Sequence, residues 1–384
     1  MKLITTTPDL QAACAELEKS QFVTVDTEFM REQTFWPKLC LVQLAAPDVE
    51  FIVDPMSPTI DLAAFWSLMT NESVVKVFHA ARQDIEIVFR ETGSVPHPVF
   101  DTQVAAMVCG FGEQISYMNL VKKITGASLD KSSRFTDWTR RPLSEKQLDY
   151  AIGDVTHLRE IYTKLKAELE SSKRASWLAE EMAILTNHAT YEQKPIDAWQ
   201  RLKLKVKNRK SLAILMSIAQ WREEAAQSQN VPRNRILRDD ALYDIANQGP
   251  KNAQDLSKLR SINDGFVRSA RAKGLIEAIS AGAKRDLETV PKLPHNEPLS
   301  AKALATLELL KVLLKASAAQ HGVATKLIAD ASDLEKLARD GTPDIPALKG
   351  WRKELFGNDA LKLKRGEVAL TLSNGDVRLI HTTN

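Results

Sequence analysis

The alternation of apolar and polar residues predicts several strands near the start of the chain. Residues 22–29 alternate and are rich in β-branched side chains, 38–45 and 50–53 are interpreted as two further strands, and 74–78 form a short apolar run. Because Asp48 lies between the second and third of these segments, we expect them to form a hairpin. The four segments are typical of a sheet with a buried interior.

Helical periodicity takes over after the first strands. Apolar residues recur at intervals of three and four in five segments, namely 60–70, 81–92, 101–110, 116–125 and 144–170. Strands interleaved with and followed by helices predict an α/β domain, a mixed sheet flanked by helices, over residues 1–190.

Two proline-bearing stretches divide the rest of the chain. Residues 187–198 and 286–298 lose periodicity, which is typical of linkers. They predict two further all-α domains, at 199–285 and 296–384.

The two later domains share a sequence element. ILRDDALYDIA at 236–246 and IADASDLEKLA at 328–338 both combine a polar turn with an apolar helix pattern, which indicates a degenerate duplication. Residues 368–380 differ, because Asn374 and Gly375 between alternating apolar residues predict a hairpin. A lone hairpin is marginally stable, so we expect it to pack against another part of the chain, such as the first domain.

Composition places the chain among soluble globular proteins. Its 384 residues are 44% hydrophobic and 26% charged, and no apolar run approaches the roughly 18 residues of a membrane span. The first residues lack the apolar core of a signal peptide, and the three scattered cysteines favour neither a zinc site nor a disulfide framework. We therefore expect a cytoplasmic protein, monomeric and without a membrane partner.

Charge is distributed unevenly along the chain. Residues 1–170 hold 17 Lys and Arg against 24 Asp and Glu, whereas residues 171–384 hold 35 against 25. An acidic front half suits chemistry with cations, and a basic back half suits a polyanionic partner such as nucleic acid.

Four carboxylates and a tyrosine stand out in the acidic half. Asp26 and Glu28 are two apart in an expected strand, so they share one face, while Tyr150 and Asp154 are one turn apart in an expected helix. Asp84 follows the apolar run 74–78 by one helical turn. Carboxylate oxygens are ligands for Mg²⁺, and a pair of such ions promotes phosphodiester hydrolysis.

These residues resemble the motifs of the DEDD exonuclease superfamily. The three matching stretches are DTE at 26–28, HAARQD at 79–84 and YAIGDV at 150–155. One subclass has a histidine five residues before the last aspartate, where this chain has Asp149. The other has a tyrosine four before, where this chain has Tyr150. The match is to the tyrosine subclass.

A longer resemblance points to the ribonuclease D family. TFWPKLCLVQLA (34–45) and FHAARQDIEIV (78–88) match its catalytic domain, and 221–242 and 321–338 resemble two helical HRDC domains. The resemblance implies a ribonuclease H-like fold and trimming of 3′ ends of tRNA precursors and other RNAs. It also implies two divalent ions, Mg²⁺ or Mn²⁺, and release of 5′-mononucleotides.

The resemblance also assigns roles to the five residues. Asp26 would bridge both ions, Glu28 and Asp154 would complete the site of the water-activating ion, and Asp84 would act through waters of the second. Tyr150 would orient the nucleophile. None of the five positions departs from the family pattern.

A second set of residues is interpreted as RNA contacts. These flank the catalytic motifs or lie in basic stretches: Phe29, Met30, His79, Gln83, Arg134, Arg201, Lys203, Lys205, Lys207 and Arg233. A structural histidine, core packing of Phe29 and a solvated charged helix are the competing interpretations. Asp101 is expected to cap the helix over 101–110.

Two other functions remain open from the residues alone. The same site serves a DNA 3′→5′ exonuclease, because recognition of the 2′-hydroxyl depends on local shape. A non-catalytic nucleic-acid-binding protein is the other alternative, although the complete carboxylate set argues against it.

Overall fold

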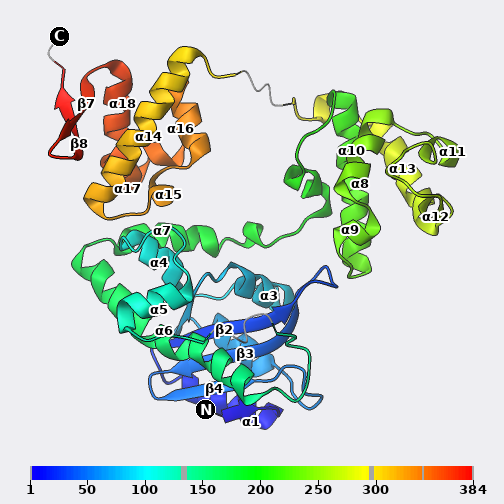
Figure 1. Ribbon diagram of the computed structural model, residues 1–384. Coiled ribbons are helices and arrows are strands. Elements are labelled where there is room, and N and C mark those ends of the chain that lie inside the picture. Colours follow the sequence, from blue (N-terminus) through cyan, green and yellow to red (C-terminus); the bar gives the residue numbers. More distant parts are fainter. Residues whose placement is uncertain (1, 131–135, 294–297, 340, 383–384) are drawn as a thin grey trace. The chain divides into compact units, whose positions relative to one another are not determined.

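The computed structural model describes residues 2–130, 136–293, 298–339 and 341–382 (Figure 1). Its contacts define two compact units. The first comprises Met1–Glu28, Leu39–Thr190 and Glu297–Asn384, and the second comprises Phe29–Lys38 and Tyr191–Asn296. The chain therefore passes between the units near both expected linkers, while the division into three domains stays a prediction.

A six-stranded mixed sheet forms the centre of the first unit. Its strand order is β1-β4-β3-β2-β5-β6. The strands are β1 (Lys2–Ile4), β2 (Phe22–Met30), β3 (Lys38–Ala46), β4 (Val49–Val53), β5 (Val75–Phe78) and β6 (Val99–Asp101). β3 and β4 form the expected antiparallel hairpin, whereas β1 pairs with β4, and β5 with both β2 and β6, in parallel.

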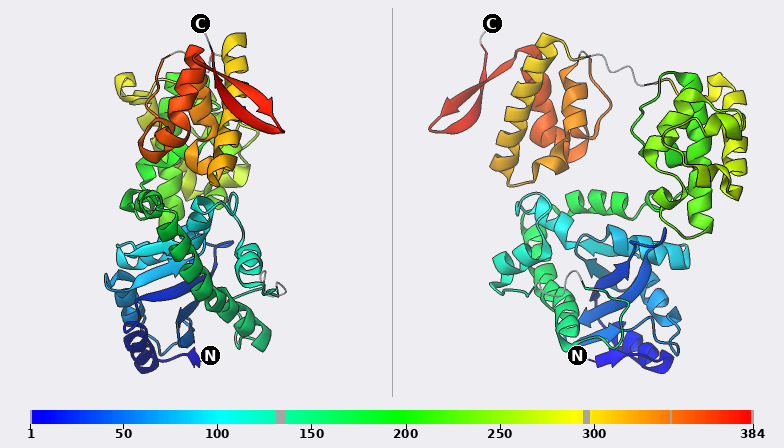
Figure 2. Two further views of the ribbon diagram at one scale, coloured as in Figure 1. Left: turned by 90° about the vertical axis from the view of Figure 1, so that its left-hand side faces the viewer. Right: turned by 45° about the vertical axis from the view of Figure 1, so that its right-hand side comes forward.

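Helices pack against this sheet. They are α1 (Thr7–Leu17), α2 (Ala63–Thr70), α3 (Arg82–Thr92), α4 (Thr102–Val108), α5 (Tyr117–Thr125), α6 (Glu145–Ser171) and α7 (Ala175–Leu185). The long α6 crosses the sheet and contacts β4 and β5 (Figure 1, Figure 2). The five expected helices are confirmed, and β1, β6, α1 and α7 are additions to the sequence-based prediction.

The C-terminal module, residues 298–382, belongs to the same unit. Its helical elements are α14 (Ala301–His321), α15 (Thr325–Ile328), α16 (Ala331–Ala338), α17 (Gly350–Arg352), a π-helical turn (Lys353–Gly357) and α18 (Asn358–Arg365). One hydrophobic core runs from the sheet and α6 through α7 into this module.

The expected C-terminal hairpin is present as β7 (Val368–Ser373) and β8 (Asp376–His381), with Asn374 and Gly375 at the turn. The expectation that it packs against another part of the chain is confirmed, but the partner differs from the suggested first domain. The hairpin contacts α14 and α18 of its own module, where Val368 is buried and Leu370 and Leu379 pack against the hydrophobic core.

The second unit is a helical bundle around α8 (Arg209–Ser228). Its other helices are α9 (Arg233–Ile236), α10 (Asp239–Gln248), α11 (Ala253–Leu256), α12 (Asp264–Val267) and α13 (Ala270–Lys284). Residues 29–38 join this unit, since Phe35 is buried against Ala226 and Ile236. Nothing in the hydrophobic pattern anticipated that attachment.

The structure bears on two expectations about the back half, the duplicated sequence element and the basic run 201–210. Both duplicated elements begin at the last residue of a four-residue helix, α9 or α15, and run into the longer helix after it, α10 or α16. The basic run 201–210 is not a helix face, because α8 begins only at Arg209 and residues 203–206 are without regular structure. In the described part of the chain, no helix is long and apolar enough to cross a membrane.

Candidate active site

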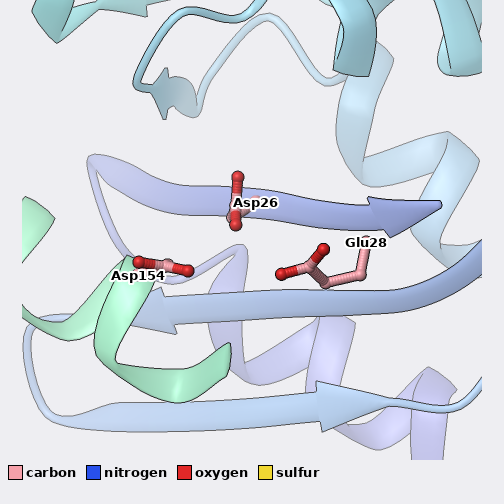
Figure 3. Close-up of side chains that lie close together, drawn as sticks. All are labelled: Asp26, Glu28 and Asp154. Carbon is pink, nitrogen blue, oxygen red and sulfur yellow. The ribbon is translucent and has the colours of Figure 1, made fainter. Parts of the chain in front are cut away.

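Three carboxylates meet where β2 passes α6. Asp26 and Glu28 project from the same face of β2, and Asp154 approaches them from α6 (Figure 3). One oxygen from each lies within 4.8 Å of the others, a spacing at which the three could share a metal ion. The two-residue spacing in the strand and the position of Asp154 in the helix therefore bring the three carboxylates together, as the sequence predicted.

Hydrogen bonds fix α6 against β2. The hydroxyl of Thr24 donates to the carbonyl of Val155 at 2.9 Å, which ties the residue after Asp154 to the strand that carries Asp26. At the helix start, Ser144 and Gln147 form a reciprocal capping box that satisfies orphan backbone donors. Thr24 was not singled out by the sequence analysis, since a buried strand threonine carries no distinctive local pattern.

Asp84 lies in the first turn of α3 but outside the group of three. Its side chain is buried and accepts a 2.5 Å hydrogen bond from the hydroxyl of Thr27. Burial raises the pKa of Asp84 to about 7. The sequence placed Asp84 near the site, but it did not reveal that Thr27 holds it.

The local electrostatics favour a bound cation. Burial is the main cause of the raised pKa of Asp26, followed by repulsion from Asp154, Asp84 and Glu28. Several carboxylates around one half-buried aspartate cost stability unless positive charge joins them. An all-oxygen donor set fits a hard divalent cation such as Mg²⁺ or Mn²⁺.

A pocket of about 660 Å³ opens beside these carboxylates. Asp26, Asp154 and Tyr150 line it, together with Lys146 and Gln114. Tyr150 lies one turn before Asp154, as expected, and its ring centroid is 6.1 Å from that of Trp138. The pocket is large enough to admit a terminal nucleotide next to the acidic group.

Tyr117 forms another wall of the pocket and was missed by the sequence analysis. Its hydroxyl donates to the carbonyl of Gly153 at 2.9 Å, directly beside Asp154. Burial raises the pKa of this phenol, with a further contribution from Asp154 and Asp26, so Tyr117 stays protonated. No motif marks this residue.

His79 lines the pocket but is tied into its frame. One ring nitrogen lies 3.0 Å from the hydroxyl of Thr102, and the other lies 3.1 Å from the carbonyl of Ile115. Burial lowers the pKa of the imidazole, which favours its neutral form. These contacts support the structural interpretation of His79 over direct RNA contact.

Asp101 has a larger role than the expected helix cap. It caps α4 through the amides of Gln103 and Val104, and it also accepts hydrogen bonds from the amides of Ala80 and Ala81 at 3.1 and 2.8 Å. Ala80 has a φ of 62°, a strained value for a residue with a side chain. Asp101 therefore holds the turn that leads into α3 and Asp84.

The remaining residues expected to contact RNA are dispersed. Gln83 is exposed on α3, and Phe29 and Met30 are half-buried at the end of β2. Arg134 lies outside the described residues. For these positions RNA contact stays a prediction.

The basic residues of the second unit differ in their surroundings. Lys203, Lys205 and Lys207 are exposed and alternate with inward-facing apolar residues. Arg201 and Arg233 instead both bind the buried carboxylate of Glu223, with Arg233 donating through two nitrogens. Arg233 also lies over the ring of Phe35 at 4.4 Å. The two arginines have a structural role that the sequence did not indicate.

Comparison with known proteins agrees with this geometry. The family described as 3′–5′ exonuclease matches residues 1–170, and the HRDC domain family matches residues 211–279. The fold and site therefore define a 3′–5′ exonuclease of the DEDD class, joined to an HRDC domain.

Full-length relatives narrow this class. The chain is 50% identical to ribonuclease D of Bartonella henselae, over 98% of this chain and 93% of that one. It is also 50% identical to ribonuclease D of Nitrobacter hamburgensis, over 98% of both chains. The crystal structure of Escherichia coli RNase D, described as an exoribonuclease involved in structured RNA processing, is 26% identical. It aligns with a TM-score of 0.82 over 95% of this chain and 98% of that one.

The chain belongs to the ribonuclease D family of 3′→5′ exoribonucleases. The expected ribonuclease H-like fold and hydrolytic exonuclease class are thereby confirmed. An HRDC domain is confirmed at residues 211–279, whereas a second one stays a prediction.

Proposed function

We propose that this chain removes 5′-mononucleotides one at a time from the 3′ ends of tRNA precursors and other RNAs. The reaction would use two divalent ions, Mg²⁺ or Mn²⁺. The observation that carries this proposal is the convergence of Asp26, Glu28 and Asp154 within 4.8 Å beside a pocket of about 660 Å³.

Asp26, Glu28, Asp84 and Asp154 would hold the ions. When bound, such ions supply an activated water and neutralise charge on the leaving oxygen. The protein contributes the placement: β2 fixes two carboxylates, Thr24 ties α6 to that strand, and Thr27 holds Asp84. Asp84 is farther from the group of three, so we propose that it acts through water.

Two tyrosines support different parts of the site. Tyr150 lines the pocket one turn before Asp154, a position from which its hydroxyl could orient the attacking water. Tyr117 stays protonated and holds the carbonyl of Gly153, so it would shape the pocket without taking a proton. We assign catalysis to Tyr150 and positioning to Tyr117.

A metal-titrated digestion tests the proposal. A 3′-extended tRNA precursor labelled at its 5′ end is incubated with the protein in increasing Mg²⁺ or Mn²⁺, beside the matching single-stranded DNA. We expect a ladder of products shortened from the 3′ end, with 5′-mononucleotides, on RNA. The variants Asp26→Ala and Asp154→Asn should show no ladder. Equal turnover of the DNA would favour a DNA exonuclease, and digestion by the Asp26→Ala variant would contradict the site.

A further inference from the structure

The C-terminal module meets a segment that ends at the catalytic pocket. Residues 107–113 comprise the last two residues of α4 and the turn after it, and Gln114, Ser116, Tyr117 and Met118 next to them line the pocket. A change in the position of residues 107–113 would therefore reach the pocket wall through a few backbone bonds.

The turn between α14 and α15 holds this segment. The amide of Ala324 donates to the carbonyl of Met107 at 3.0 Å. Gly110 packs so closely that a Cβ there would lie 2.6 Å from the carbonyl oxygen of Gly322. The hydroxyl of Thr325 also donates to the carboxylate of Glu113, one residue before the pocket-lining Gln114.

Arg174 reinforces the same contact from the start of α7. Its guanidinium donates to the carbonyl of Val108 at 3.0 Å on one side, and to the carbonyls of Gly322 and His321 on the other. One side chain thus joins residues 107–113 to the turn of the C-terminal module.

A second contact attaches the module to α7. Arg352 is 9% exposed and pairs with Glu180 and Glu181 of α7, while Trp351 stacks on Trp177 at 4.5 Å with an interplanar angle of 11°. Buried, multiply bonded ion pairs and stacked rings hold a fixed geometry better than exposed pairs do. The attachment is therefore rigid rather than a loose tether.

The pocket side of the segment is fixed as well. The carbonyl of Ile115 accepts a hydrogen bond from the side-chain Nε2 of Gln103 at 3.1 Å and lies 3.1 Å from a ring nitrogen of His79. Gln114 has a φ of 47°, a strained value that persists only where its surroundings impose it. The segment is thus held at both ends, by the pocket frame and by the C-terminal module.

We infer that the C-terminal module is a positioning element of the active site, acting through residues 107–118, and not only a surface for RNA. The inference rests on the proposed nuclease function and adds that cleavage requires contact between the C-terminal module and residues 107–118. Loss of the contact would impair cleavage of even a trinucleotide, which is too short to extend far beyond the pocket.

Two substitutions test the contact from the module's side. Ala324→Pro removes the amide that binds Met107, and the φ of −66° at this position suits proline. Arg352→Met removes the ion pairs to α7. Ala301→Pro, at the exposed first residue of α14, and Arg365→Met, whose ion pair lies within the module, are the matched controls.

The full-length variants are compared by two measurements. Hydrogen exchange of amides 107–118 reports whether the segment is released, and kcat and KM are measured on a trinucleotide and on a long RNA. We expect Ala324→Pro and Arg352→Met to speed exchange and to lower kcat on both substrates at least tenfold. The two controls should match the wild type.

Two results would overturn the inference: unchanged exchange at residues 107–118 in both variants, or faster exchange with wild-type kcat on the trinucleotide. Failure of the proposed function has a different signature. The wild type would then cleave neither substrate, while hydrogen exchange would still decide whether the module holds the segment.

Discussion

Asp26 and Glu223 have opposite electrostatic surroundings. Asp26 is half-buried, and its pKa is raised first by this burial and then by the carboxylates around it, whereas Glu223 is 1% exposed and lies between Arg201 and Arg233. Bringing like charges together away from water costs stability, and pairing a buried charge removes most of that cost. The surroundings of Asp26 suit the proposed ion binding, and those of Glu223 suit a structural role.

Asp84 should make the stability of the metal-free protein depend on pH. Its pKa is raised from 3.8 to about 7, so between these values the folded protein holds a proton that the unfolded chain has released. Stability therefore falls as pH rises through this window, by at most about 1.4 kcal/mol per pH unit. The Asp84→Asn variant keeps an acceptor for the hydroxyl of Thr27 but has no carboxyl group that gains or loses a proton in this range.

Urea unfolding with a metal chelator at several pH values from 4 to 8 measures this effect. We expect the Asp84→Asn variant to become progressively more stable than the wild type up to about pH 7. The expectation fails if the difference between the two proteins is constant across the range.

Arg233 should matter more for stability than for RNA binding. Arg233→Ala leaves Glu223 with Arg201 as its remaining arginine partner, and loss of one partner of a buried pair costs on the order of 3 kcal/mol. Lys207→Ala, an exposed control, should be neutral. Thermal unfolding checks both, and adding Glu223→Met to the Arg233→Ala variant should restore part of the loss. An unchanged Tm in Arg233→Ala would contradict the structural role.

At the scale of elements, long strands and helices were predictable and short ones were not. β2 and β3 span nine residues each, long enough for their strand character to be recognised, whereas β1 and β6 have three residues each. Such short strands are selected by pairing with β4 and β5, which is not encoded locally. The competing interpretation of the basic run 201–210 as a charged helix is wrong, because its lysines alternate with Leu and Val at a period of two, not 3.6.

Close packing of α8 and α13 requires a glycine at their contact. A Cβ on Gly282 would lie 2.6 Å from the Cα of Ile214 and 2.8 Å from the carbonyl oxygen of Ala213. Both atoms belong to backbone, so Gly282→Ala should force the helices apart and cost about 1–3 kcal/mol.

Ser280→Ala, exposed on the same helix, is the control and should be neutral or slightly stabilising. Urea unfolding, monitored by the circular dichroism signal of the helices, compares the stability of the two variants with that of the wild type. Equal midpoints for the wild type and Gly282→Ala would mean that the helices can separate without loss.

At the scale of the whole molecule, the convergence of Asp26, Glu28 and Asp154 was easier to predict from the sequence than the relations between distant segments. The carboxylates follow from spacing within one strand and one helix, which are local properties. The attachment of the C-terminal module to α7 depends on Trp351 and Arg352 meeting residues more than 170 positions away. No local pattern indicates which distant surface an arginine will reach.

The uneven charge leads to a prediction about RNA affinity. Residues 171–384 carry the excess of Lys and Arg, and Lys203, Lys205 and Lys207 are exposed within it. Each lysine that contacts a phosphate of single-stranded RNA contributes about 0.7 to the slope of log affinity against log salt. Replacing all three with Ala should therefore reduce the magnitude of that slope by up to about 2.

The matched control replaces Lys19, Lys122 and Lys123 with Ala. These lysines are exposed in the acidic half, and their replacement removes the same net charge. If both triple variants reduce the slope of log affinity against log salt equally, the effect reflects net charge, and residues 203–207 do not form a local RNA contact. A lower slope in the first variant alone would place the RNA backbone along this stretch.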